Sequence, residues 1–424
     1  MRLICDLHLH SKYSRATSRD MNLPNIDKWA RIKGIQVVTT SDFTHPEWLK
    51  EIKEKLEPAE PGLFKLKKIY WQNNCHTTSQ DPRFLLTTEI SSIYSKDGKT
   101  RKVHNLVFMP SLEAVERFNA QLGWIGNLKS DGRPILGLDI QELLKITLDT
   151  SSEAMLVPAH LWTPWFSVFG SKSGFDSLEE AFGNLSDNIY AVETGLSSDP
   201  AMNWRLSSLD RITLISNSDA HSPRKLGREA NVLDCDLSYA DIVETIKSGD
   251  PKNFLYTIEF FPQEGKYHYD GHRNCDILFS PTESKKHKDL CPKCGKPLTL
   301  GVMYRVNELA DRPEGQSPKN KHSFKSLIPL EEIVAEVLGQ NPGTKAVDRE
   351  YKTIIEAFGS EFNVLLDASI EDIASKTNDM IAEAISRVRQ KKLEIVPGYD
   401  GVFGKIKIFK QDELKNLSSQ KTLF

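Results

Sequence analysis

The chain has 424 residues, of which 39% are hydrophobic and 27% are charged, and its formal net charge at pH 7 is −3. This length predicts two or three domains, and the near-neutral charge argues against a uniformly basic coat for nucleic acid while leaving room for a local basic face. Six cysteines are too few for a disulfide scaffold. We find no signal-peptide pattern and no apolar run of bilayer length, and therefore expect a cytoplasmic protein without a membrane partner.

Strand-like runs that end in polar residues recur through the first half of the chain. They cover residues 2–11, 35–43, 84–91, 102–110, 154–161, 189–196 and 211–221. Helix-compatible stretches lie between or after them, at residues 25–33, 111–121, 139–148, 177–183 and 239–247. Alternating strands and helices over this length predict an α/β barrel or a doubly wound sheet.

The second half of the chain has a different pattern. A cysteine-containing module is expected from about residue 264, and apolar residues at three- and four-residue spacing predict helices at 328–339, 347–359 and 369–392. We therefore predict a barrel over 1–235, a connecting segment over 236–263, a zinc-binding module over 264–325 and a helical domain over 326–424.

Candidate metal ligands gather at the ends of the predicted strands. In a strand, residues two apart point the same way, so His8 and His10 can reach one ion, and Asp219 and His221 repeat this spacing. Each histidine alone fits an ordinary hydrogen-bonded core position, but so many buried imidazoles and carboxylates at one edge are costly unless coordinated. The full set of candidate ligands is His8, His10, Asp42, His45, Glu89, His104, His160, Asp219 and His221, with Glu193 as a further rim carboxylate.

This number of ligands implies more than one ion. Imidazole and carboxylate suit zinc, manganese or iron, and Glu89 is placed to bridge two of them. Paired ions activate water and stabilise a leaving oxygen, which predicts phosphoester hydrolysis. We expect the catalytic residues to be His8, His10, Glu89, Glu193, Asp219 and His221, with Glu193 contacting either an ion, a ligand or a base.

A second metal site is expected in the module. His272, Cys275, Cys291 and Cys294 have nearly the spacing of a closed tetrahedral zinc site, in which His268 competes with His272 for the fourth position. Such a site carries no chemistry and contributes to folding. Several cations surround it, either as a solvated face or as a contact for a nucleic-acid backbone: Lys266, Arg273, Lys285, Lys286, Lys288, Lys293 and Lys296.

The first 225 residues or so resemble the PHP (polymerase and histidinol phosphatase) family. The resemblance lies in DLHLHS, NSDAH and the PAH around His160, together with Asp42, Glu89 and His104. It implies a distorted seven-stranded barrel with a metal cluster at its rim. It also implies that His8, His10, Glu89 and Asp219 hold one ion, and that Glu89, His104 and His160 hold a second.

The chain departs from the PHP pattern at the third metal site. Phe43 follows Asp42 where family members commonly have histidine, and no histidine lies between Ser11 and Phe43. A third ion therefore depends on substitution by His45 and His221.

The whole chain is similar to the endonuclease Q family, through the barrel motifs, HRNC with CPKCGKPLTLGV, and PGYDGVFGKIKIF. This implies an archaeal-type, metal-dependent DNA repair endonuclease that cuts double- or single-stranded DNA 5′ of uracil, hypoxanthine, xanthine and abasic sites. The implied cofactors are structural and catalytic zinc, with a further divalent cation such as magnesium or manganese. A small-molecule phosphomonoesterase like histidinol phosphatase is the alternative.

Recognition of a deaminated base requires that the nucleotide be turned out of the duplex. The loop from Trp162 to Phe175 follows His160, and either lines that pocket or seals the top of the barrel. The pocket candidates are Trp165, Phe166, Phe169 and Ser171.

The last residues, 419–424, resemble the clamp-binding peptides of archaeal replication proteins. Gln420, Leu423 and Phe424 would be the anchors. This resemblance implies a contact with the sliding clamp, proliferating cell nuclear antigen.

Overall fold

The fold is built on a large mixed sheet. In the computed structural model, which describes residues 1–72, 81–410 and 413, this sheet has 11 strands, and its path runs β15-β12-β11-β1-β2-β5-β4-β3 with β6, β7 and β8 beside it. β9 (Ala191–Glu193) and β10 (Thr213–Ile215) form a separate parallel pair. The large sheet contains β1 (Arg2–Asp6), β2 (Val37–Thr39), β3 (Leu56–Pro58), β4 (Phe64–Leu66), β5 (Arg83–Lys96), β6 (Lys99–Met109), β7 (Ile135–Leu136), β8 (Met155–Pro158), β11 (Ala230–Asp234), β12 (Phe254–Glu259) and β15 (Ser323–Ser326).

The two faces of the strands feed two apolar clusters. Leu3 and Cys5 of β1 belong to one cluster, and the intervening Ile4 belongs to the other, as the alternation of a strand requires. The first cluster also takes side chains from β2, β5, β6, β8, β9 and β10, among them Val37 and Ile215. In the described part of the chain, however, no β-ladder joins β8 to β9 or β10 to β1, so hydrogen bonding does not close these strands into a ring.

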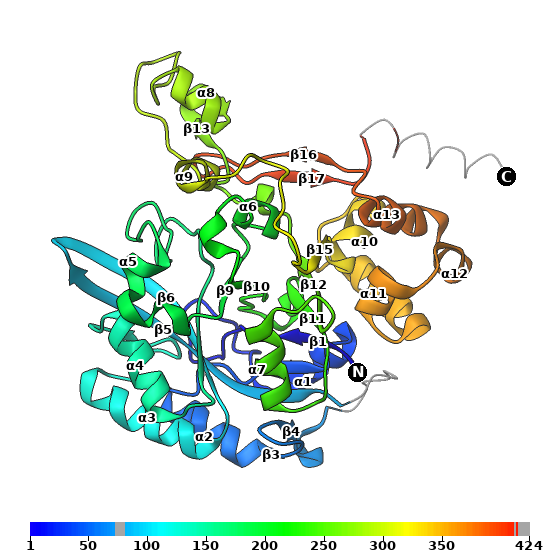
Figure 1. Ribbon diagram of the computed structural model, residues 1–424. Coiled ribbons are helices and arrows are strands. Elements are labelled where there is room, and N and C mark those ends of the chain that lie inside the picture. Colours follow the sequence, from blue (N-terminus) through cyan, green and yellow to red (C-terminus); the bar gives the residue numbers. More distant parts are fainter. Residues whose placement is uncertain (73–80, 411–412, 414–424) are drawn as a thin grey trace.

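Helices pack on the outside of these strands (Figure 1). α1 begins after Asn22, whose side chain accepts a hydrogen bond from the Asn25 N–H, and ends at Gly34 in the left-handed conformation. The helices of this half are α1 (Leu23–Lys33), α2 (Pro46–Lys55), α3 (Leu112–Ile125), α4 (Ile140–Thr150), α5 (Leu178–Phe182), α6 (Pro200–Asn203) and α7 (Tyr239–Ser248). Each helix predicted here is confirmed. Among the described helices, none is long and apolar enough to span a membrane.

The alternation of strands and helices is interrupted in the described part of the large sheet at two antiparallel hairpins, the short β3–β4 and the long β5–β6. β5 and β6 are the two arms of a long antiparallel hairpin, which turns at Asp97 and Gly98, both with positive φ. An Asp-Gly turn of this kind matches the twist of antiparallel strands, so no helix is needed between them. The hairpin sets His104 opposite Ser91, two residues from Glu89 along β5, and so places the two candidate ligands on adjacent strands.

The cysteine-containing segment is an excursion from the main sheet. The chain leaves at the end of β12, forms β13 (Asp270–His272), β14 (Ile277–Phe279), α8 (Pro281–Lys286) and α9 (Val302–Leu309), and returns as β15 parallel to β12. Figure 1 shows α8 and β13 projecting from the body beyond the hairpin of β16 (Glu394–Val396) and β17 (Lys405–Lys407). Gly271 and Thr299 form a bridge at the base of the excursion, and Tyr269 bridges to Tyr399.

The tail is helical as predicted, with one difference. It contains α10 (Leu330–Leu338), α11 (Lys345–Phe358), a π-helical turn (Asn363–Asp367), α12 (Ile370–Lys376) and α13 (Asp379–Arg389). The expected helix over 369–392 is broken at Thr377, which is extended, and Asn378 then caps α13 by accepting a hydrogen bond from the Ile381 N–H. An asparagine favours a cap over a helix interior, which accounts for the break.

Several ion pairs join the helical tail to the rest of the chain, and their charges are arranged in the same way. In each pair the cation comes from residues 2–225 and the carboxylate from the tail. The pairs are Arg2–Asp367 at 2.9 Å, Lys33–Glu361 at 2.7 Å, Arg224–Glu331 and Arg224–Asp348 at 2.9 Å, and Lys225–Glu332 at 2.8 Å. The buried member is Lys33–Glu361, in which each side chain is 4% exposed.

Candidate functional site

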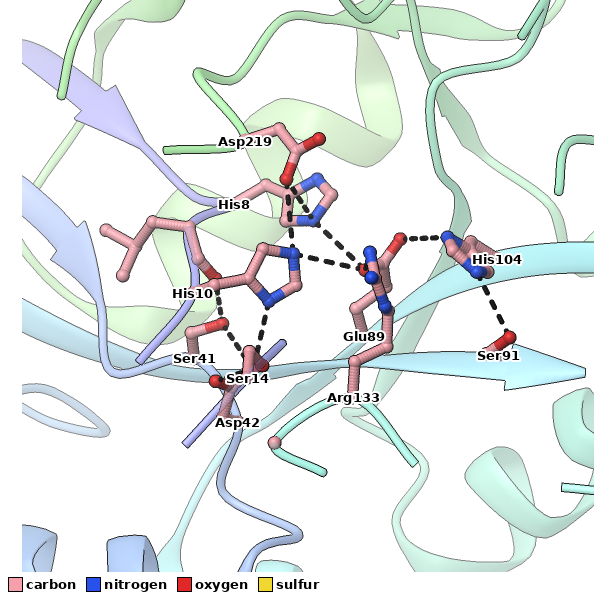
Figure 2. A network of polar contacts seen from close by, with 12 residues as sticks. His8, His10, Ser14, Ser41, Asp42, Glu89, Ser91, His104, Arg133 and Asp219 are labelled. Carbon is pink, nitrogen blue, oxygen red and sulfur yellow. Dashed lines mark hydrogen bonds and ion pairs between the residues drawn. The ribbon is translucent and has the colours of Figure 1, made fainter. Parts of the chain in front are cut away.

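The first group of potential ligands lies just beyond β1. His10 Nε2 lies 3.1 Å from Asp219 Oδ1, and His8 Nε2 lies 3.6 Å from the same oxygen (Figure 2). These three atoms are buried, yet none makes a hydrogen bond of good geometry in the described structure. The ligand atoms of His8, His10 and Asp219 all fall within 4.8 Å of one another. Atoms that are buried, unpaired and convergent fit a metal ion, because leaving them without one would be costly.

The second group lies on the β5–β6 hairpin and after β8. Glu89 Oε1 lies 2.8 Å from His104 Nδ1 and 3.1 Å from His160 Nε2. The other oxygen, Oε2, lies 3.2 Å from His10 Nε2, so Glu89 stands between the two groups. The sequence predicted that Glu89 bridges two ions, and its place between the two groups is compatible with that prediction.

The electrostatics of the second group favour cation binding. Burial acts to raise the pKa of Glu89, but the nearby His104, Arg133 and His8 outweigh it and hold that pKa well below its ordinary value. Burial, opposed by Glu89, lowers the pKa of His104 to about 4, so this imidazole is neutral at pH 7. An ionised carboxylate beside neutral imidazole is the donor set that divalent metals bind.

Two further carboxylates hold the outer nitrogens of the ligand histidines. Glu193 lies 3.0 Å from His8 Nδ1 and also accepts hydrogen bonds from the His160 N–H at 2.8 Å and from Asn217 Nδ2 at 2.9 Å. Both Glu193 oxygens are thereby occupied. Glu193 thus lies outside the two ligand groups, in the position of a residue that orients His8.

Asp42 has the matching position beside His10. Its Oδ1 lies 3.2 Å from His10 Nδ1, while Oδ2 accepts hydrogen bonds from the Ser11 N–H at 2.7 Å and from the hydroxyls of Ser11 and Ser14 at 2.6 and 2.8 Å. A Cβ on Gly132 would lie 2.3 Å from Oδ2, so the loop leaves little room there. Asp42 was expected to ligate a metal, but it lies outside both ligand groups.

His45 and His221 also lie outside the two groups. The His221 Nδ1 contacts the Asp219 carbonyl oxygen at 2.9 Å, and its ring lies 4.6 Å from that of His10. The His45 ring stacks on Tyr13 at 4.3 Å. The described residues therefore assemble no third ligand group around these histidines.

One cation at the centre was not anticipated. Arg133 Nη1 lies 3.0 Å from Glu89 Oε2. Arg133 belongs to an irregular loop between α3 and β7, and neither periodicity nor motif spacing singled it out. Only the folded chain brings it to the ligands.

The cysteine site assembles with the predicted members. His272, Cys275, Cys291 and Cys294 offer ligand atoms within 4.8 Å of one another, whereas His268 is buried elsewhere against Tyr269. Burial opposes ionisation of Cys291, but the N–H groups of Cys294 and Lys293 lower its pKa to about 6. A thiolate is the form that binds zinc, so this three-cysteine, one-histidine cluster fits a structural zinc ion.

The aromatic loop after His160 divides into two parts. Phe169 is fully buried, and the centre of its ring lies 5.1 Å from that of Trp162. This position fits the alternative in which the loop covers the top of the predicted barrel. Phe166 packs on His104 at 4.6 Å, and Trp165 is 51% exposed with Lys102 Nζ 5.3 Å from its ring centre. Ser171 is exposed.

The predicted clamp-binding residues Gln420, Leu423 and Phe424 lie outside the described residues, and that contact stays a prediction.

Two family descriptions and several known proteins match the chain. "PHP-associated" matches residues 205–251, and "MJ0043 C-terminal domain" matches residues 329–392. The uncharacterized protein YqxK of Bacillus subtilis is 31% identical over 88% of this chain and 89% of its own length. The uncharacterized protein MJ0043 of Methanocaldococcus jannaschii is 35% identical over 62% of this chain, and that match spans only 33% of MJ0043.

Two solved structures match almost the whole chain. The lesion-specific endonuclease PfuEndoQ from Pyrococcus furiosus has a TM-score of 0.84 and 33% identity, over 98% of this chain and 99% of that one. An endonuclease Q in complex with a 27-mer duplex substrate carrying an abasic lesion at the active site has a TM-score of 0.83 and 34% identity, over 98% of both chains.

The fold and the two buried ligand groups define an α/β metal-dependent hydrolase of PHP type. More specifically, the chain belongs to the endonuclease Q family of DNA endonucleases.

Proposed function

We propose that this protein is a DNA repair endonuclease that hydrolyses the phosphodiester 5′ of deaminated bases (uracil, hypoxanthine and xanthine) and of abasic sites. The observation that carries the proposal is the match over 98% of both chains to an endonuclease Q bound to a duplex with an abasic lesion at its active site. Buried ligand groups of the type used for phosphoester hydrolysis support it from the chain's own residues.

The proposed ligand sets follow the two groups. His8, His10 and Asp219 hold one divalent ion, His104 and His160 hold a second, and Glu89 contacts both. Bound zinc, manganese or magnesium ions would supply an activated water and charge stabilisation for the leaving oxygen. Glu193 and Asp42 orient His8 and His10 through their Nδ1 atoms, which keeps both Nε2 atoms aimed at the centre.

We further propose that the strands around the first apolar cluster, the one that contains Leu3 and Cys5, form the distorted seven-stranded barrel of the PHP fold. The support is the apolar cluster that draws side chains from β1, β2, β5, β6, β8, β9 and β10. Such an arrangement sets the ligand groups at one rim, where loops from several strands meet.

For the substrate, we propose that Trp165 and Phe166 face the extruded base. Phe166 touches the ligand His104, and the half-exposed Trp165 offers a stacking surface beside it. The zinc module would contact the DNA backbone through side chains that are all exposed: Lys266, Arg273, Lys285, Lys286, Lys288, Lys293 and Lys296. The duplex would then be held between the rim and the module.

The test uses end-labelled duplexes that contain one uracil, one hypoxanthine, one abasic site or no lesion, each with manganese and with chelator. We expect a metal-dependent nick directly 5′ of the lesion and none in the normal duplex. Glu89→Gln should abolish the nick, whereas the matched Glu116→Gln, on the exposed face of α3, should retain it. Intact duplexes together with hydrolysis of a small phosphomonoester would refute the proposal in favour of a phosphatase.

A further inference from the structure

The guanidinium of Arg133 lies at the junction of the two ligand groups. Its Nη1 is 3.0 Å from Glu89 Oε2, the same oxygen that lies 3.2 Å from His10 Nε2 (Figure 2). The Arg133 side chain is 24% exposed, so it is reachable from outside while most of it is buried. In the described structure Glu89 is the side chain with which the guanidinium forms its ion pair.

The backbone around Arg133 is held on both sides. The Arg133 N–H donates to Asp131 Oδ1 at 3.1 Å, and the Gly132 N–H donates to the Tyr13 carbonyl oxygen at 3.0 Å. The Pro134 carbonyl oxygen accepts a hydrogen bond from the Ser91 N–H at 3.0 Å, on the strand that carries Glu89. The loop therefore presents the arginine to the centre in a fixed position, which favours a functional role over a chance contact of a long side chain.

The pairing of Arg133 with Glu89 would weaken in a metal-loaded centre. A carboxylate that holds cations shares its negative charge with them, so Glu89 would neutralise the guanidinium less well. An arginine is always charged, and a partly buried charge requires an anion. The anion that a phosphodiesterase brings to this point is the phosphate of its substrate, whose geometry suits two parallel hydrogen bonds from one guanidinium.

We propose that Arg133 binds the non-bridging oxygens of the scissile phosphodiester, exchanging Glu89 for the substrate when the metals are bound. This inference rests on the proposed function and names a substrate-contacting residue for it. Arg133 is then a group that neutralises the charge developing on the phosphate, next to the oxygen of Glu89 that His10 also approaches. Arginines in such positions act by electrostatic stabilisation, and loss of one donor of this kind costs about 10²–10³ in rate.

The experiment compares wild type with Arg133→Ala, Arg133→Lys and the control Arg15→Ala. Arg15 pairs with Asp131 of the same loop at 3.3 Å but is 77% exposed, so it matches Arg133 in charge and neighbourhood without reaching the ligands. Calorimetric titration with manganese, without DNA, should show that Arg133→Ala binds the metal at least as tightly as wild type, because a competing cation has been removed from Glu89. Weaker manganese binding would overturn the proposal, since Arg133 would then support the ligand itself.

A second titration uses inorganic phosphate and the manganese-loaded proteins. We expect Arg133→Ala to bind phosphate at least tenfold more weakly than wild type and Arg15→Ala, with Arg133→Lys intermediate because an ammonium keeps the charge but not the paired geometry. Equal phosphate affinities would overturn the inference. On lesion duplexes, kcat should fall about 10²–10³-fold in Arg133→Ala. If wild type nicks none of the duplexes, the proposed function fails, and the phosphate titration still decides the role of Arg133.

Discussion

The buried ion pair Lys33–Glu361 gives the sharpest stability prediction. Lys33 Nζ lies 2.7 Å from Glu361 Oε2, and each side chain is 4% exposed. Lys33→Met would leave the Glu361 carboxylate buried without its cation, and breaking such a pair costs about 3–5 kcal/mol. Glu361 would keep hydrogen bonds from the Leu330 N–H at 3.1 Å and the Tyr351 hydroxyl at 2.6 Å, which places the expected loss at the lower end, about 3 kcal/mol.

The assay is urea unfolding followed by circular dichroism and by tryptophan fluorescence. The exposed pair Lys53–Glu116 provides the control, since its side chains are 41% and 55% exposed and Lys53→Met should change the free energy of unfolding by less than about 0.5 kcal/mol. The double variant Lys33→Met/Glu361→Gln should recover much of the loss, because the amide oxygen still accepts a hydrogen bond and carries no charge. If Lys33→Met destabilises no more than Lys53→Met, the reasoning from burial is wrong.

Three further predictions concern the metal sites and the core. Cys291→Ser should remove about one equivalent of zinc by elemental analysis and expose the module to proteolysis; retention of zinc would show that another ligand set is used. Glu193→Gln should weaken manganese binding about 10–100-fold in calorimetry by loosening His8, and unchanged affinity would exclude an orienting role. Burial raises the pKa of Glu259 to about 8 from an ordinary 4.5, so the folded state binds the proton more tightly and wild-type stability should fall as pH rises between these values. In Glu259→Gln that fall should become smaller in urea unfolding at pH 5.5 and 8.5, with a remainder from the buried Glu229, whose pKa is also raised by burial. Identical slopes for the two proteins would contradict this prediction.

The sequence predicted the convergence of those candidate ligands whose spacing follows from strand geometry. His8 and His10 lie two apart beyond a buried strand, so they had to share a side, and Asp219 belongs to a motif of the same kind. Five helices of this part of the chain were predicted because their apolar residues repeat with the helical period, whereas α2 and α6 were not predicted. These features are local, and local patterns are what a single sequence records.

The remaining features depend on distant contacts. Asp42 resembled a ligand by its place at a strand end, but Ser11 and Ser14 occupy one of its oxygens and His10 lies against the other. Arg133 reaches Glu89 from a loop with no periodic pattern. Whether a carboxylate faces a metal or supports a histidine is decided by a shift of a few ångströms, which residue spacing does not encode.

The hairpin between β5 and β6 was a different kind of omission. Its Asp97-Gly98 turn is a local signal, flanked by residues that alternate between the two faces of the strands. The expectation of alternating strands and helices obscured it.

The parallel pairing of β12 with β15 sets a limit on how this protein can be shortened. Adjacent parallel strands cannot be joined by a tight turn, because the chain must travel back to the starting end before the second strand begins, which takes about a dozen residues or more. In this protein the return path is the cysteine-containing excursion itself. A deletion that joined Glu259 directly to Ser323 would therefore remove β15 from the sheet along with the module, whereas a replacement linker of sufficient length would preserve it.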